Sequence, residues 1–145
     1  MKKQNAVWIT VSWILVAACM AVIFALSAQV ASESSELSGW LTRLLVGIPE
    51  AEKYVRKAAH ALEFMGLAVL FFNALRATCG YNRPCLSFIL TVIYAATDEF
   101  HQLFVEGRAC SFFDVCVDSV GAALGIIAVS VLAMIIEKIK RRKLQ

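Results

Sequence analysis

Charge is scarce in this sequence: only 17% of its 145 residues are Asp, Glu, Lys or Arg, and only two are proline. A disordered chain or a coiled coil would carry far more charge, and seven glycines are too few for a collagen repeat. The five cysteines are odd in number and follow no CxxC or Cys-His spacing. These shortages exclude disorder, a coiled coil, collagen and a disulfide scaffold, and we expect free thiols.

Apolar residues are abundant instead. They make up 60% of the chain, and the mean hydropathy is +0.72, whereas soluble domains are roughly 45–50% apolar. A helix needs about 20 apolar residues to cross a bilayer. Four such blocks occur, at residues 6–28, 58–76, 86–104 and 112–136. We predict an all-α polytopic membrane protein, a four-transmembrane-helix bundle forming a single domain over residues 1–145, with one long helix over residues 50–76.

The segment between the first two blocks has an amphipathic pattern. Five apolar residues recur at the spacing of one helical face: Leu37, Trp40, Leu41, Leu44 and Leu45. The opposite face carries Glu36, Ser38 and Arg43. This pattern predicts a short interfacial amphipathic helix between the first and second spans.

The positions of Lys and Arg predict the orientation. Most of them flank one side of the predicted membrane segments, namely Lys2, Lys3, Arg76, Arg83, Lys138, Lys140, Arg141, Arg142 and Lys143. Fewer flank the other side, namely Arg43, Lys53, Arg56, Lys57 and Arg108. By the positive-inside rule, both termini are cytoplasmic. The basic tail accounts for the net charge of +3, so we expect the lipid bilayer and no nucleic acid as partner.

Ionisable residues inside the spans all fall in their outer halves. At about 1.5 Å per residue, Glu63 lies roughly 20 Å above the cytoplasmic end of its span, and Asp98 roughly 18 Å above the end of the next. Because a charged group in lipid costs several kcal/mol, we expect these polar faces to meet. Arg108 lies in a short outer connection beside them. The candidate polar site, for binding or catalysis, is His60, Glu63, Asp98, Glu99, Gln102, Arg108 and Asp114, with Asp118 one turn beyond Asp114.

Simpler interpretations apply to some of these residues. His60 and Glu63 alone are more typical of an interfacial helix end, whereas four acids in two facing segments favour a functional or buried network. Gly121 and Gly125 form a GxxxG pattern, which indicates close helix packing within the chain or, in an oligomer, between chains.

At residues 56–60 (RKAAH), residues 98–108 (DEFHQLFVEGR) and then Ser111, Asp114 and Asp118, the sequence resembles the VanZ-like membrane protein family. Residues 24–29 (FALSAQ) resemble the end of that family's first span. The sequence departs at Glu106, where proline is common, and at Phe64, where tyrosine is common. The resemblance implies a bacterial cytoplasmic membrane location, a role at the cell envelope, and low-level glycopeptide (teicoplanin) tolerance such as the founding member confers.

Three hypotheses follow. In the first, the outer polar site binds a lipid, a cell-wall precursor or a glycopeptide. In the second, it is a membrane-embedded enzyme with a carboxylate as general base, paired with His60 or His101, and with Arg108 holding a phosphate or carboxylate. In the third, the site is a structural ion-pair network without a ligand. We expect no cofactor and no metal, since the acids and His60 lack a recognised metal motif.

Overall fold

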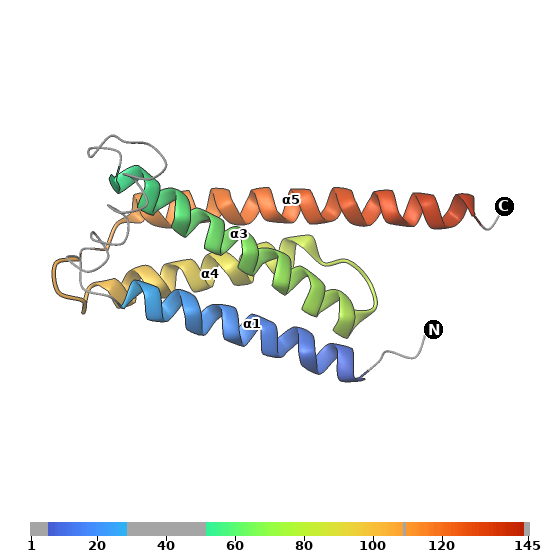
Figure 1. The fold of residues 1–145 in the computed structure, drawn as a ribbon, viewed down its shortest axis with the longest axis horizontal. Coiled ribbons are helices and arrows are strands. Elements are labelled where there is room, and N and C mark those ends of the chain that lie inside the picture. Colours follow the sequence, from blue (N-terminus) through green and yellow to red (C-terminus); the bar gives the residue numbers. More distant parts are fainter. Residues whose placement is uncertain (1–5, 29–51, 109, 144–145) are drawn as a thin grey trace.

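The computed structural model describes residues 6–28, 52–108 and 110–143. These residues form four helices, α1 (Ala6–Ser27), α3 (Glu52–Cys79), α4 (Pro84–Gln102) and α5 (Phe112–Arg142), and the described part of the chain contains no strand (Figure 1). The all-α prediction is therefore confirmed, including one long helix where residues 50–76 were expected to form it. The predicted interfacial helix lies outside the described residues.

Three of the four helices are long and apolar enough to cross a membrane. They are α1, α3 over Tyr54–Cys79, and α5. The fourth helix, α4, has 19 residues and buries five polar side chains along one stripe: Ser87, Thr91, Asp98, Glu99 and Gln102. These polar residues lower its average hydropathy, so α4 is not among the described helices that are able to cross a membrane by length and composition, and the predicted fourth span is not shown.

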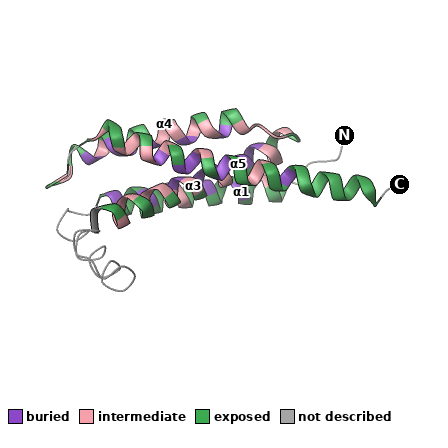
Figure 2. Ribbon diagram, turned by 90° about the horizontal axis from the view of Figure 1, so that it is seen from above, coloured by how far each residue is buried: buried purple, intermediate pink, exposed green. Residues whose placement is uncertain are grey.

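The helices lie side by side, and α3 contacts each of the other three. α1 and α4 run in one direction, and α3 and α5 run in the opposite one (Figure 1). The α4–α5 loop (residues 103–111) therefore lies at the end where α3 and α5 begin. The α3–α4 turn (residues 80–83) lies at the other end, together with the start of α1. α5 extends past this turn, and its last turns are exposed (Figure 2).

Local sequence signals set two of the connections. α3 ends at Cys79, and the next residue is Gly80. Gly80 takes φ 81° and donates its amide N–H to the Arg76 carbonyl at 2.9 Å, as glycine does at many helix C-termini. Pro84 occupies the first turn of α4, where its missing N–H costs nothing. Gly107, with φ 74°, turns the α4–α5 loop back toward the bundle.

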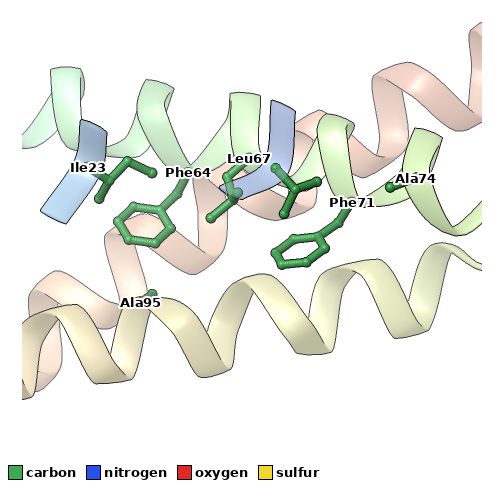
Figure 3. Packing of buried hydrophobic residues seen from close by; sticks show 7 residues of the cluster. Ile23, Phe64, Leu67, Phe71, Ala74 and Ala95 are labelled. Atoms are coloured by element: carbon green, nitrogen blue, oxygen red, sulfur yellow. The ribbon is translucent and has the colours of Figure 1, made fainter. Parts of the chain in front are cut away.

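The apolar core lies along α3. Phe64, Leu67 and Phe71 pack against Ile23 of α1 and Ala95 of α4 (Figure 3). A second cluster on another side of α3 joins it to α5 and comprises Ala68, Phe72, Ala122, Ile126 and Ala133. The central helix thus fixes the positions of its three neighbours, and with them the polar residues that each carries.

Two glycines bring α5 onto the backbone of α3. A Cβ on Gly121 would lie 2.1 Å from the carbonyl oxygen of Ala61, and one on Gly125 would lie 2.5 Å from that of Met65. No side chain fits there, so the GxxxG pattern serves a contact within the chain. Oligomerisation through Gly121 and Gly125 stays a prediction.

Candidate polar site at the α4–α5 loop end

A cavity of about 140 Å³ opens at the end of the bundle where α3 and α5 begin. We call it the polar cavity. Its walls come from the first turns of α3, the end of α4, the α4–α5 loop and the first turns of α5. The lining residues are Arg56, Lys57, His60, Glu99, Gln102, Gly107, Arg108, Asp114, Val117 and Asp118. Almost all of them are polar, and charges of both signs are present.

His60 lies among three carboxylates from three helices. Its Nε2 is 3.6 Å from Asp98 Oδ2 on α4, and its Nδ1 is 3.7 Å from Glu63 Oε2 and 3.8 Å from Asp118 Oδ1 on α5. The ring stacks on the buried Phe64 at 5.4 Å between centroids. Phe64 therefore fixes one face of an imidazole that is 18% exposed.

Asp98 is the most heavily hydrogen-bonded acid of the group. The Ser27 hydroxyl on α1 donates to its Oδ1 at 2.6 Å, and the Gln102 amide donates to its Oδ2 at 3.3 Å. Gln102 Oε1 in turn accepts from Arg108 at 3.5 Å. This chain of contacts runs from the end of α1 through α4 into the α4–α5 loop, and both Asp98 and Gln102 are buried.

Glu99 stabilises the start of α5. Its Oε2 accepts the backbone N–H of Ser111, the residue before the first turn of α5, at 2.9 Å. A carboxylate is favourable there because the first N–H groups of a helix have no partner within it and carry partial positive charge. The Ser111 side chain makes no capping bond, so the acid on α4 supplies the cap.

Three cations line the cavity. Lys57 pairs with Asp114 across α3 and α5, and its ammonium lies 5.0 Å from the centre of the Phe113 ring. Arg56 and Arg108 line the same cavity from α3 and from the loop. Burial, and then repulsion from Arg56, lower the pKa of Arg108, so these guanidinium groups lie within electrostatic range of each other. An anion between them would relieve that repulsion.

Two buried polar atoms at the cavity have no hydrogen-bond partner in the described structure. They are Asp118 Oδ2 and His60 Nδ1. Asp118 is only 2% exposed and lines the cavity, so its carboxylate loses water without gaining a protein donor for that oxygen. Such an atom costs free energy unless water or a ligand satisfies it.

The match to a family model covers residues 12–134, which is most of the chain, and the model is described as VanZ/LLP1. The chain belongs to the VanZ/LLP1 family. The matched range includes every residue of the polar cavity and ends before the basic tail. No curated protein and no solved structure matched the chain in the other two comparisons.

In this VanZ/LLP1 chain, the seven predicted site residues lie at the same end of the bundle. His60, Glu99, Gln102, Arg108 and Asp114 line the polar cavity. Glu63 and Asp98 do not line it, but both flank His60.

Four further residues belong to the VanZ/LLP1 site and were left out of the predicted set: Ser27, Arg56, Lys57 and Asp118. Asp118 was noted beside the predicted set from its i,i+4 spacing to Asp114, and Arg56 and Lys57 could have been found from the RKAAH segment. Ser27 carried a weaker signal, a small polar residue where an apolar helix ends. His101, the other histidine considered, packs its ring 4.2 Å from that of Phe24 and does not line the cavity.

Metal ligation finds no support in the geometry of the described residues. Within them, no three His, Cys, Asp or Glu side chains converge as ligands would. The carboxylates around His60 each stay more than 3.5 Å from its ring nitrogens. The five cysteines are free and lie outside the cavity lining.

Proposed function

We propose that this VanZ/LLP1 protein binds the small polar headgroup of a cell-envelope amphiphile, a lipid or a lipid-linked cell-wall precursor, in its polar cavity. The unpaired Oδ2 of Asp118 carries the proposal, because Asp118 lines the cavity and this buried oxygen needs a donor such as a hydroxyl or amine. Arg56 and Arg108 suit an acidic group on the same ligand. The headgroup therefore combines an anionic group with a hydrogen-bond donor.

The size of the cavity selects among the candidate ligands. A volume of 140 Å³ corresponds to about five water molecules at ~30 Å³ each. Sites for drug-sized molecules are about 300–1,000 Å³. A phosphate with a few attached atoms fits inside, whereas a glycopeptide does not. We propose that tolerance to teicoplanin, if this member confers it, follows from binding the envelope amphiphile rather than the antibiotic.

We further propose that α4 is a fourth span. Its buried stripe is polar, while its exposed face is apolar and includes Ile89, Ile93 and Phe100, each more than half exposed. A helix on the surface of a soluble protein buries its apolar side and exposes its polar side, and α4 does the reverse. This arrangement fits a helix whose exposed side contacts lipid. At about 1.5 Å per residue its 19 residues reach ~28 Å, close to the hydrocarbon thickness.

The proposed orientation places the polar cavity outside and both termini in the cytoplasm of a bacterial cell. The α3–α4 turn carries Arg83, and the adjoining end of α5 carries Lys140, Arg141 and Arg142. Arg76, in the last turn of α3, lies 3.7 Å from Glu137 of α5 at the same end. A basic cluster of this kind favours the cytoplasmic side.

Thermal unfolding of the purified full chain in detergent, with and without glycerol phosphate, tests the binding proposal. We expect the probe to stabilise the wild type, and Arg108→Gln and Asp118→Asn to lose that stabilisation. Arg83→Gln, a matched arginine change at the opposite end of the bundle, should keep it. The opposite result is that glycerol phosphate stabilises none of the proteins and that both cavity variants are less stable than the wild type. That result would favour a structural ion-pair network instead.

The link to antibiotic tolerance needs a cellular test. Teicoplanin susceptibility is measured in a strain expressing the wild type, Arg108→Gln or Arg83→Gln at equal protein levels. If strains expressing the wild type or Arg83→Gln are less susceptible than the strain expressing Arg108→Gln, the cavity has a role in tolerance. Equal susceptibility with all three proteins would contradict it.

The surroundings of His60 support a second candidate function, a membrane-embedded acid/base enzyme. A histidine within 3.6–3.8 Å of three carboxylates can exchange protons with any of them once a substrate or water intervenes. Turnover of a lipid-linked precursor by the purified protein, abolished by Asp98→Asn or His60→Gln, would establish it. Binding without turnover across a lipid panel would contradict it.

A further inference from the structure

An apolar groove runs along the bundle surface beside the polar cavity. It has a volume of about 390 Å³ and lies between α3 and α5. The residues lining this groove are Ala58, Ala61, Leu62, Met65, Val117, Val120, Gly121 and Leu124. Val117 lines both the groove and the polar cavity, so the two spaces adjoin.

The groove is formed by small residues at its base and larger ones at its edges. Gly121 lies against the backbone of Ala61, which draws the two helices together beneath the groove. Leu62, Val120 and Leu124 are each more than half exposed. These side chains belong to helices that are long and apolar enough to cross a membrane, and in the proposed orientation the open side of the groove faces hydrocarbon.

The groove also runs in the direction that a lipid chain attached to a group in the cavity would take. α3 and α5 run in the same direction (Figure 1). The residues that line the groove follow both helices, from Ala58 and Val117 near the cavity to Met65 and Leu124. The seven-residue step from Ala58 to Met65 corresponds to ~10 Å of helix. A chain attached to a group in the cavity would enter the groove beside Val117.

The charges at the cavity end of the groove determine which headgroup suits it. Asp114 is paired with Lys57, and Glu99 accepts the Ser111 N–H, so these two acids have partners. Arg56 and Arg108 line the same cavity from two different elements. Each guanidinium group can donate two parallel hydrogen bonds to two oxygens of a phosphate. A phosphate has enough oxygens to accept from two arginines in this way, whereas a carboxylate has only two oxygens.

We propose that the ligand is a phosphate-bearing lipid whose phosphate lies in the polar cavity against Arg56 and Arg108 and whose hydrocarbon chain lies in the α3–α5 groove. This inference rests on the proposed headgroup site and extends it to the chain. It predicts that the protein distinguishes a lipid phosphate from the same phosphate without a chain, and from the same chains without phosphate.

The test compares two substitutions on the lipid-facing side of α5. Leu124 lines the groove and Leu132 does not line it, and each is 55% exposed. Leu124→Trp fills the groove without touching the cavity, and Leu62→Trp does so from the opposite wall. Binding of dioleoyl phosphatidate and of dioleoylglycerol to the detergent-purified full chain is measured by native mass spectrometry. Binding of glycerol phosphate is measured by thermal shift.

We expect the wild type to bind the phosphatidate and not the dioleoylglycerol. Leu124→Trp and Leu62→Trp should weaken phosphatidate binding about tenfold, because the tryptophan occupies space in which part of the lipid chain would be buried. Both should bind glycerol phosphate as the wild type does, and this also shows that they are folded. Leu132→Trp should match the wild type with every probe.

The outcomes separate the groove from the cavity. If both groove variants bind the phosphatidate like the wild type while Arg108→Gln loses it, the groove inference is wrong and the headgroup site stands. If Arg108→Gln retains both phosphate probes, the headgroup site itself is wrong. Equal binding of dioleoylglycerol and phosphatidate would show a groove that takes lipid chains without regard to phosphate, which also contradicts the inference.

Discussion

The hydroxyl of Ser27 donates a 2.6 Å hydrogen bond to the carboxylate of Asp98, joining the last turn of α1 to α4 across 71 positions of sequence. Both residues are almost fully buried. A second hydrogen bond joins the same two helices, from the Tyr94 hydroxyl to the Met20 carbonyl at 2.6 Å. The bond to Asp98 is therefore one of two polar connections between α1 and α4 in the described residues. It also holds Asp98 in place beside His60.

Ser27→Ala should therefore destabilise the protein by about 1–3 kcal/mol, since a buried carboxylate oxygen loses its donor. Ser12→Ala provides a matched control on the same helix. Ser12 is also buried, but its hydroxyl donates only to the Trp8 carbonyl one turn earlier, so its loss should change stability little. Unfolding in detergent measures both, and equal effects would show that the bond to Asp98 contributes nothing.

Asp118→Asn distinguishes a binding site from a structural network. If the unpaired Oδ2 is held ready for a ligand, removing the charge should keep or raise the stability of the ligand-free protein, by up to about 2 kcal/mol, while abolishing binding. A structural network predicts the opposite sign, because the contact of Asp118 with His60 at 3.8 Å would be weakened. Thermal unfolding without added ligand gives the sign directly.

Gly121→Ala should disrupt the packing of α5 on α3. The added Cβ would lie 2.1 Å from a backbone oxygen that cannot move aside, so we expect a loss of about 3 kcal/mol or more. Gly66→Ala is the control, since nothing lies within 4 Å of its added Cβ. That change should stabilise α3 by about 0.5–1 kcal/mol through helix propensity. Similar stabilities of the two variants would mean that α5 does not approach α3 so closely.

Two native thiols report whether α4 crosses the membrane. Cys85 lies in the first turn of α4 and Cys110 in the loop after it, and both are exposed. In variants that retain one of them, a membrane-impermeant maleimide should label Cys110 in intact cells and Cys85 only after permeabilisation. Labelling of both from the same side would refute a fourth span.

The sequence was sufficient to predict the helices, because long apolar blocks between charges leave few alternatives. The expected block at residues 6–28 corresponds to α1 almost residue for residue. α5 contains the predicted block at residues 112–136 and continues to Arg142 through a basic segment that hydropathy excludes but helix propensity permits. The convergence of Glu63 and Asp98 beside His60 followed from helical rise alone.

What the sequence could not give was the pairing of individual atoms. Four carboxylates at one depth have many possible partners, and only the packed structure assigns Lys57 to Asp114 and the Ser111 amide to Glu99. The role of Ser27 was hidden for the same reason, since a serine in an apolar helix usually bonds its own backbone, as Ser12 does. Likewise the groove depends on how closely two glycines let the helices approach.

The contact of Gly121 with the backbone of α3 also bears on how the protein is made. α5 leaves the ribosome after α1, α3 and α4, and the cavity needs its Asp114 and Asp118 as well as residues of α3, α4 and the α4–α5 loop. The cavity can therefore form only after the first turns of α5 have been made. Until then Asp98 can already contact Ser27 and His60, whereas Glu99 lacks the backbone N–H of Ser111 that it accepts in the folded protein.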